Sequence, residues 1–152
     1  MNKTGKIIII SITVIILITL PLIFLKKNTV NLEEVEKTLL KEYELRKLEM
    51  NNISNYFGIS EYDPDTMLFL TDFEESDKPF SPNTLIVIIN NGKYKEYYNT
   101  LKGYIEMEIS NSLDQARIEL YNNAIVKPSS NYFYLIISND KSISKLISKY
   151  YK

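Results

Sequence analysis

Apolar residues are concentrated first in one long run near the N-terminus of the chain. From Ile7 to Leu25 there is no charged residue, and the polar members are one serine and two threonines. At about 1.5 Å per residue, a helix of this length reaches roughly 28 Å, which is close to the hydrocarbon thickness of a bilayer. We therefore expect residues 7–25 to form a transmembrane helix.

The flanks of this run favour a permanent signal anchor over a cleaved signal peptide. A signal peptide has an apolar core of about 7 to 15 residues followed by a site of small residues such as A-x-A. Here the first alanine is Ala116, and two lysines, Lys26 and Lys27, follow the run directly. The lipid bilayer, contacted through residues 7–25, is thus an expected partner, and a membrane protein is a second possible one.

The orientation of the anchor follows from the length of its N-terminal flank. Two lysines stand on each side of the run, so the charge balance is even. A very short tail is typical of the cytoplasmic end of a signal anchor. We expect residues 1–6 to form a cytoplasmic tail, residues 26–30 a linker, and residues 31–152 an extracytoplasmic domain, with the protein in the cell membrane as a single-pass chain.

The domain begins with a pattern typical of an amphipathic helix. Asn31 followed by Glu34 resembles a capping box, and Leu32, Val35 and Leu39 recur at helical spacing. We expect this helix to continue to about residues 51–52, where two asparagines end the pattern.

Two β-type segments follow. Residues 66–73 read TMLFLTDF after a turn at Pro64, and residues 85–90 read LIVIIN. Residues 74–82 between them form a polar loop with two prolines. The continuous apolar run at 85–90 is typical of a central strand that is buried on both faces.

The second half of the domain returns to helical periodicity and then to short strands. The spacing of apolar residues from 94 to 105 predicts a helix that breaks near Asn111, and an S-x-x-Q capping box from Ser112 predicts a second helix to about Asn123. Residues 124–127 and 132–138 predict a hairpin, and Asp140 is placed to cap a final helix. The predicted fold class is α+β, a four-stranded, mostly antiparallel sheet with helices packed on one face.

Composition excludes several classes of chemistry. The chain has no His and no Cys, which removes the common catalytic triads, cysteine nucleophiles and zinc–thiolate sites. From residue 28 to the end, 14 basic residues stand against 19 acidic ones, and a nucleic-acid-binding domain needs a dominant basic face instead. We therefore predict no nucleic-acid partner, and the sequence assigns no catalytic residue, no cofactor-binding residue and no metal ligand.

Two spacings resemble catalytic motifs but have a simpler structural explanation. Tyr98 and Lys102 match the Y-x-x-x-K of short-chain dehydrogenases, yet no glycine-rich nucleotide loop accompanies them. Ser142 and Lys145 match the S-x-x-K of penicillin-binding proteins, yet they lie on the final amphipathic helix and no K-T-G strand follows. Core and surface positions of helices explain both spacings.

Carboxylates provide the remaining alternative chemistry. Asp63 with Asp65, or Glu74 with Glu75, could form the pair that glycoside hydrolysis needs. Neighbouring residues usually point apart, so a structural turn is the favoured interpretation of Asp63 and Asp65.

The C-terminal helix carries two further candidate contact surfaces. Its lysines, Lys141, Lys145, Lys149 and Lys152, could meet anionic lipid or wall polymer, although a solvated face is the commoner case. Tyr150 and Tyr151 are candidate exposed contacts with a partner.

Three stretches also carry a resemblance to a known family. FGISEYDPDTMLFL, LIVIIN and NNAIVKPSSNYFYLIISND, within residues 32 to 150, resemble a Firmicute extracytoplasmic family described only as domain of unknown function four-three-five-eight. The resemblance implies a small secreted or membrane-tethered domain without an assigned activity. Where a glycine is common in that family, this chain has Ser130, and a spanning helix replaces a lipidated cysteine.

Together these patterns predict a noncatalytic binding, adaptor or assembly module displayed at the cell surface. The alternative is a carboxylate-dependent hydrolase that acts on cell-wall material. The sequence does not identify a small-molecule ligand.

Overall fold

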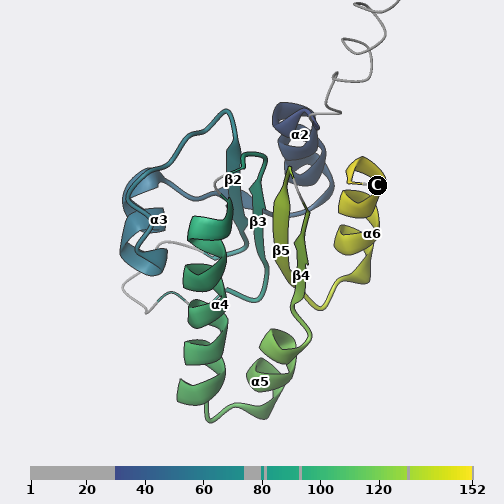
Figure 1. Cartoon of the computed structure of the whole chain (residues 1–152). Coiled ribbons are helices and arrows are strands. Elements are labelled where there is room, and N and C mark those ends of the chain that lie inside the picture. The colour runs from purple at the N-terminus through teal and green to yellow at the C-terminus, as the bar shows by residue number, and fades with distance from the viewer. Residues whose placement is uncertain (1–29, 74–79, 81, 93, 130, 152) are drawn as a thin grey trace, which may run out of the picture.

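The computed structural model describes residues 30–73, 80, 82–92, 94–129 and 131–151, which form an antiparallel sheet between two layers of helices (Figure 1). The elements in chain order are α2 (Leu32–Glu42), β1 (Arg46–Lys47), α3 (Met50–Phe57), β2 (Met67–Thr71), β3 (Leu85–Ile89), α4 (Tyr94–Asn111), α5 (Gln115–Asn122), β4 (Ile125–Pro128), β5 (Phe133–Ile137) and α6 (Lys141–Tyr150). The α+β class is thus confirmed.

The five strands follow the order β1-β2-β3-β5-β4, and every neighbouring pair is antiparallel. β3 is central, and all five of its residues are buried, as the continuous apolar run predicted. The hairpin of β4 and β5 is also confirmed. Met67, Ile89 and Phe133 lie level with one another in β2, β3 and β5. We call this end of the sheet the Asn90 end, because Asn90 follows β3 there.

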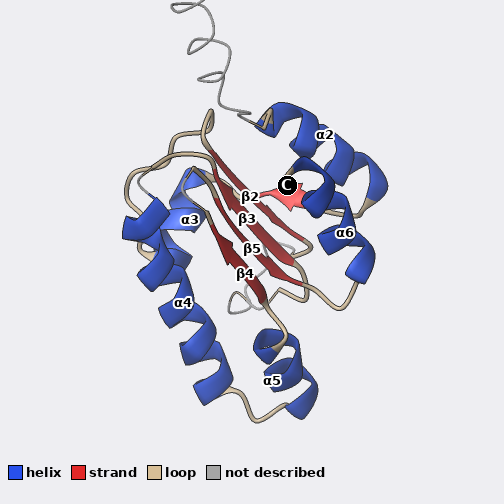
Figure 2. Cartoon of the chain, turned by 45° about the vertical axis from the view of Figure 1, so that its right-hand side comes forward, coloured by secondary structure: helices blue, strands red, loops and turns tan. Residues whose placement is uncertain are grey.

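Helices cover both faces of the sheet, so the prediction that they pack on one face was wrong. Figure 2 shows α3 and α4 on one side of the strands and α2 and α6 on the other, with α5 beyond the strand ends. Alternate residues of β3 serve the two sides: Val87 and Ile89 join the core under α3, α4 and α5, whereas Ile86 and Ile88 join the core under α2 and α6. A strand that is apolar on both faces needs a layer on each side.

The first helix is shorter than its pattern predicted. α2 ends at Glu42 because Tyr43 is extended (φ −132°, ψ 150°), and the chain then forms β1 against β2 and a separate helix α3. α3 ends at Gly58, whose φ of 64° suits glycine best. The sheet therefore has five strands instead of the predicted four. The additional strand, β1, has only two residues, which is too short to show an alternating pattern in the sequence.

The helix caps agree with the sequence in two places and differ in a third. The side chains of Asn31 and Asp140 accept from the backbone N–H groups of Glu33 and Ser142, as N-caps do. α4 does end at Asn111, but α5 is capped by Asp114, whose carboxylate accepts from the N–H of Ala116. The predicted cap at Ser112 was wrong by two residues.

The predicted anchor at 7–25, the tail at 1–6, most of the linker at 26–30 and the carboxylate pair Glu74–Glu75 lie outside the described residues. Within the described ranges, none of the helices has the length and hydropathy that crossing a bilayer requires.

Candidate functional site

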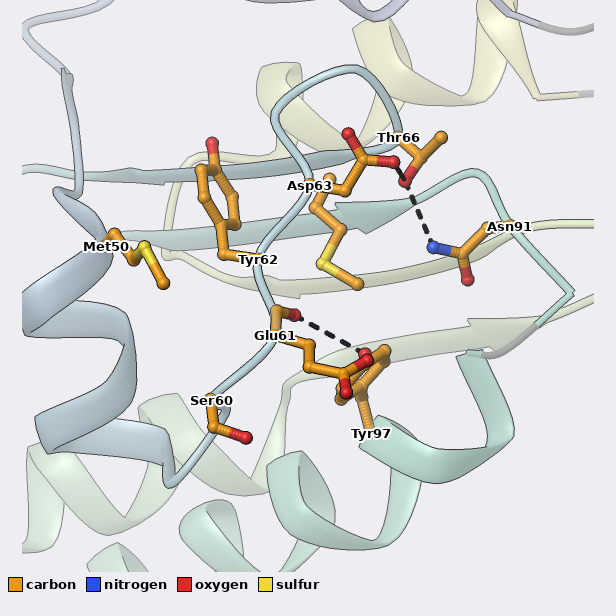
Figure 3. Close-up of a pocket in the computed structure, with 9 residues that line it drawn as sticks. Met50, Ser60, Glu61, Tyr62, Asp63, Thr66, Asn91 and Tyr97 are labelled. Carbon is orange, nitrogen blue, oxygen red and sulfur yellow. Dashed lines mark hydrogen bonds between the residues drawn. The ribbon is translucent and has the colours of Figure 1, made fainter.

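A hollow of about 480 Å³ opens at the Asn90 end of the sheet, beside α3 and the start of α4 (Figure 3). This volume lies within the range of small-molecule sites. Its lining combines two methionines and two tyrosines with hydroxyl, amide and carboxyl groups: Met50, Ser60, Glu61, Tyr62, Asp63, Thr66, Met67, Asn91 and Tyr97. The hollow therefore offers apolar area together with a small number of polar groups.

The segment from Ser60 to Thr66 is shaped by a tight turn before β2. The carboxylate of Asp63 accepts from the N–H of Asp65 (3.0 Å) and from the hydroxyl of Thr66 (2.8 Å). Asp63 thus folds the turn, as Asx side chains commonly do, and Asp65 is exposed outside the lining of the hollow. The interpretation of Asp63 and Asp65 as a structural turn fits this geometry.

Hydrogen bonds between distant segments fix the rim of the hollow. Asn91 donates from Nδ2 to the hydroxyl of Thr66 (3.1 Å), and the N–H of Asn90 donates to the Thr66 carbonyl (2.7 Å). On the other side, the Tyr97 hydroxyl donates to the backbone carbonyl of Glu61 (3.4 Å). The rim is therefore held by α4 and the end of β3 as well as by its own turn.

The two carboxylates of the lining occupy opposite parts of the hollow. In Figure 3, the carboxylate of Glu61 lies beside Tyr97, whereas that of Asp63 turns toward Thr66. Glycoside hydrolysis needs an acid and a second carboxylate that flank one bond. The two carboxylates are therefore better placed to hold polar groups of a ligand at separate points than to act together on one bond.

Tyr62 brings an unsatisfied polar group to the lining of the hollow. Its hydroxyl is buried and has no hydrogen-bond partner within the described residues. Burial raises the pKa of Tyr62, while the nearby charge of Lys47, which pairs with Glu36 at 2.9 Å, opposes that rise. The phenol is consequently neutral at physiological pH and retains a donor and an acceptor.

A second polar cluster lies where α4 and α5 meet. Arg117 donates to a carboxylate oxygen of Glu108 (2.5 Å) and to the Tyr121 hydroxyl (3.2 Å), which is itself hydrogen-bonded to the Tyr104 hydroxyl (3.1 Å). Burial raises the pKa of Tyr121 and, most of all, that of Tyr104. These bonds satisfy buried phenols and tie the two helices together, which is a structural role.

The spacings that resemble catalytic motifs do not form catalytic pairs. The Tyr98 ring packs edge-on against Phe133, and Lys102 forms an exposed ion pair with Glu106 (3.6 Å). The Ser142 hydroxyl donates to Asp140 (2.6 Å) and is bonded to the Tyr43 hydroxyl (2.7 Å), whereas Lys145 is exposed on α6. Both motifs are thus accounted for by helix packing and capping.

The structure also shows how exposed the two candidate tyrosine contacts at the C-terminus are. Tyr151 is buried (6% exposed) and Tyr150 is half-buried, so the expectation that Tyr151 is exposed was wrong. Within the described residues, no group of three or more His, Cys, Asp or Glu side chains is placed to hold a metal ion.

Sequence reasoning did not single out Glu61, Asn91 or Tyr97 as parts of a site. Tyr97 lies within the helix predicted from the apolar spacing at 94 to 105, and it is buried, but its hydroxyl reaches across to the segment before β2. Asn91 directly follows the predicted strand at residues 85–90, and nothing in that pattern points to a site. No local pattern pairs these positions, because the contacts join residues 25 to 36 positions apart.

The resemblance to a family of unknown function stays a prediction. Comparisons of the chain with protein-family models, with curated proteins and with solved structures found no match.

Proposed function

We propose that this chain is a single-pass membrane protein whose domain, residues 31–152, is a noncatalytic binding module on the outer side of the membrane. The hollow at the Asn90 end is its recognition site. The observation that supports this proposal most is that the hollow's rim is fixed by hydrogen bonds between Thr66, Asp63 and Asn91 and between Tyr97 and Glu61.

A fixed polar rim is suited to recognition because its groups need no ordering when a ligand arrives. The side chains of Met50 and Met67 add apolar area that can adapt to the shape of a ligand. Met50 is 52% exposed, an unusual position for so large an apolar side chain. Covering Met50 would bury apolar surface and so favour binding.

The test places a photo-crosslinking amino acid at Met50 in the full chain in its own membranes. We expect a discrete adduct from this position and none from the same group at Leu113, which is fully exposed on the far side of the domain. Thr66→Val removes the hydroxyl that joins Asp63 to Asn91 while keeping the side-chain shape, and it should weaken the adduct. Thr100→Val, on the exposed surface of α4, is the matched control.

The full chain can also be used to test the alternative function, hydrolysis of cell-wall material. Soluble peptidoglycan fragments are incubated with the full chain, and products are followed by mass spectrometry. Cleavage that is lost in both Glu61→Gln and Asp63→Asn would contradict the noncatalytic proposal. Equal labelling from Met50 and Leu113, unaffected by Thr66→Val, would contradict the hollow as the recognition site.

A further inference from the structure

Lysine and tyrosine side chains gather at the Asn90 end beside α6 and β4. We propose that this surface, made of Lys127, Tyr132, Lys149 and Tyr150, rests against the phospholipid headgroups of the bilayer. The inference rests on the proposed membrane anchor and adds a second contact between the protein and the lipid.

The start of the domain is fixed at the Asn90 end of the sheet. Asn90 donates from Nδ2 to the Val30 carbonyl (2.9 Å) and accepts at Oδ1 from the Tyr151 hydroxyl (3.0 Å). The Tyr151 ring packs on Tyr132, with 4.7 Å between ring centroids. The first and last parts of the domain are therefore held together at one end of the sheet.

The chain between Val30 and the apolar run at 7–25 is short. Only residues 26–29 separate Leu25 from Val30, and five residues of fully extended chain span at most about 18 Å. The headgroup layer is about 5–8 Å thick on each side of the hydrocarbon. An anchor ending at Leu25 thus keeps the Asn90 end at or just above the headgroups.

The surface held near the headgroups carries lysine and tyrosine side chains. Lys127 and Lys149 are exposed, and neither has an ion-pair partner among the described residues. Tyr132 and Tyr150 are half-buried, and the Tyr150 hydroxyl is hydrogen-bonded to the Thr38 hydroxyl of α2 (3.3 Å), so these two rings are partly covered by the domain and partly exposed. Lysine and tyrosine are suited to the membrane–water interface because they combine an apolar stem or ring with a polar tip.

Acidic residues at the same end determine which side faces the lipid. Glu33 and Glu34 lie in the first turn of α2, whereas Glu96 in the first turn of α4 stands beside an exposed lysine, Lys95. Anionic headgroups repel these carboxylates and attract the two lysines. The domain should therefore lean on its α6 and β4 side.

The test uses tryptophan fluorescence, since the chain has no Trp of its own. The full chain carrying Tyr150→Trp is reconstituted into nanodiscs of phosphatidylcholine and phosphatidylglycerol that contain a headgroup spin label. We expect strong quenching of this tryptophan, whereas Leu113→Trp, beyond the opposite end of the sheet, should stay as bright as in unlabelled discs. Circular dichroism checks that each variant is folded, and Tyr132→Trp provides a second reporter.

A charge variant separates the surface from the anchor. Lys127→Gln with Lys149→Gln should reduce the quenching of Tyr150→Trp while the protein stays in the discs. Retention in the discs with both reporters unquenched would overturn the headgroup surface and leave the anchor standing. Elution of the folded protein without discs would overturn the anchor and this inference with it.

Discussion

The buried tyrosines of α4 and α5 illustrate how single side chains stabilise this domain. Tyr104 is 5% exposed, and its hydroxyl is bonded to that of Tyr121, which also accepts from Arg117. A buried phenol without a partner would cost free energy, so the pair satisfies two groups at once. Arg117 lies 5.0 Å from the centre of the Tyr121 ring and adds a cation–π contact.

Replacing Tyr104 by phenylalanine tests this pair. Tyr104→Phe removes one hydrogen bond but leaves the Tyr121 hydroxyl bonded to Arg117, so we expect the free energy of unfolding to fall by about 1 kcal/mol. Urea unfolding at neutral pH measures the change. Tyr94→Phe is the control, because Tyr94 is buried and stacks on Phe133 without a side-chain hydrogen bond to lose among the described residues. An equal loss in both variants would contradict the role of the bond.

The same residue predicts a dependence on alkaline pH. Burial raises the pKa of Tyr104, so above about pH 10 the unfolded chain releases this proton while the folded chain keeps it. Tyr104 therefore makes its full contribution to the free energy of unfolding below about pH 10, and this contribution decreases as the pH rises further. Tyr104→Phe should therefore make the alkaline fall of the unfolding free energy shallower by about 1.4 kcal/mol per pH unit. If the free energy of unfolding fell equally steeply with pH in the wild type and in Tyr104→Phe, the claim that Tyr104 is a buried, neutral phenol would be contradicted.

At the scale of elements, β3 serves both layers of helices. Ile88 is buried toward α2 and α6, whereas Ile89 is buried toward α3 and α4, and each is 0% exposed. Ile88→Ala and Ile89→Ala should each lower the free energy of unfolding by about 2–5 kcal/mol, because each leaves a cavity in a closed core. A sheet covered on one face would lose stability in only one of these variants, and chemical denaturation distinguishes the outcomes.

The elements that the sequence predicted well are those whose pattern is local. The apolar run of β3 and the caps at Asn31 and Asp140 depend on neighbouring residues, and each is present. β1 consists of two exposed residues, Arg46 and Lys47, which are extended because they pair with β2. Such an element has no periodicity of its own, so the helical pattern before it was extended too far.

The candidate site was less predictable for the same reason. The turn at Asp63 and Pro64 was visible in the sequence, because turn residues act locally. The hollow itself depends on Asn91 and Tyr97 reaching that turn from β3 and α4. Contacts of this range follow from the strand order and the register, which the sequence pattern alone does not specify.

At the scale of the whole molecule, the hollow and the start of the domain share one end of the sheet. Asn91 lines the hollow, and the preceding Asn90 holds the Val30 carbonyl. In the proposed arrangement, recognition takes place close to the membrane, and the α5 end of the domain extends away from it.

The measurement that tests this account most directly is the labelling of a single cysteine in intact cells. The chain has no Cys, and Leu113 is fully exposed, so Leu113→Cys gives one accessible thiol on the domain. The account predicts that a membrane-impermeant maleimide labels this thiol on intact cells and that the labelled protein stays in alkali-washed membranes. A thiol that reacts only after lysis, or a labelled protein that is released by the alkali wash, would contradict the membrane-anchored outer domain.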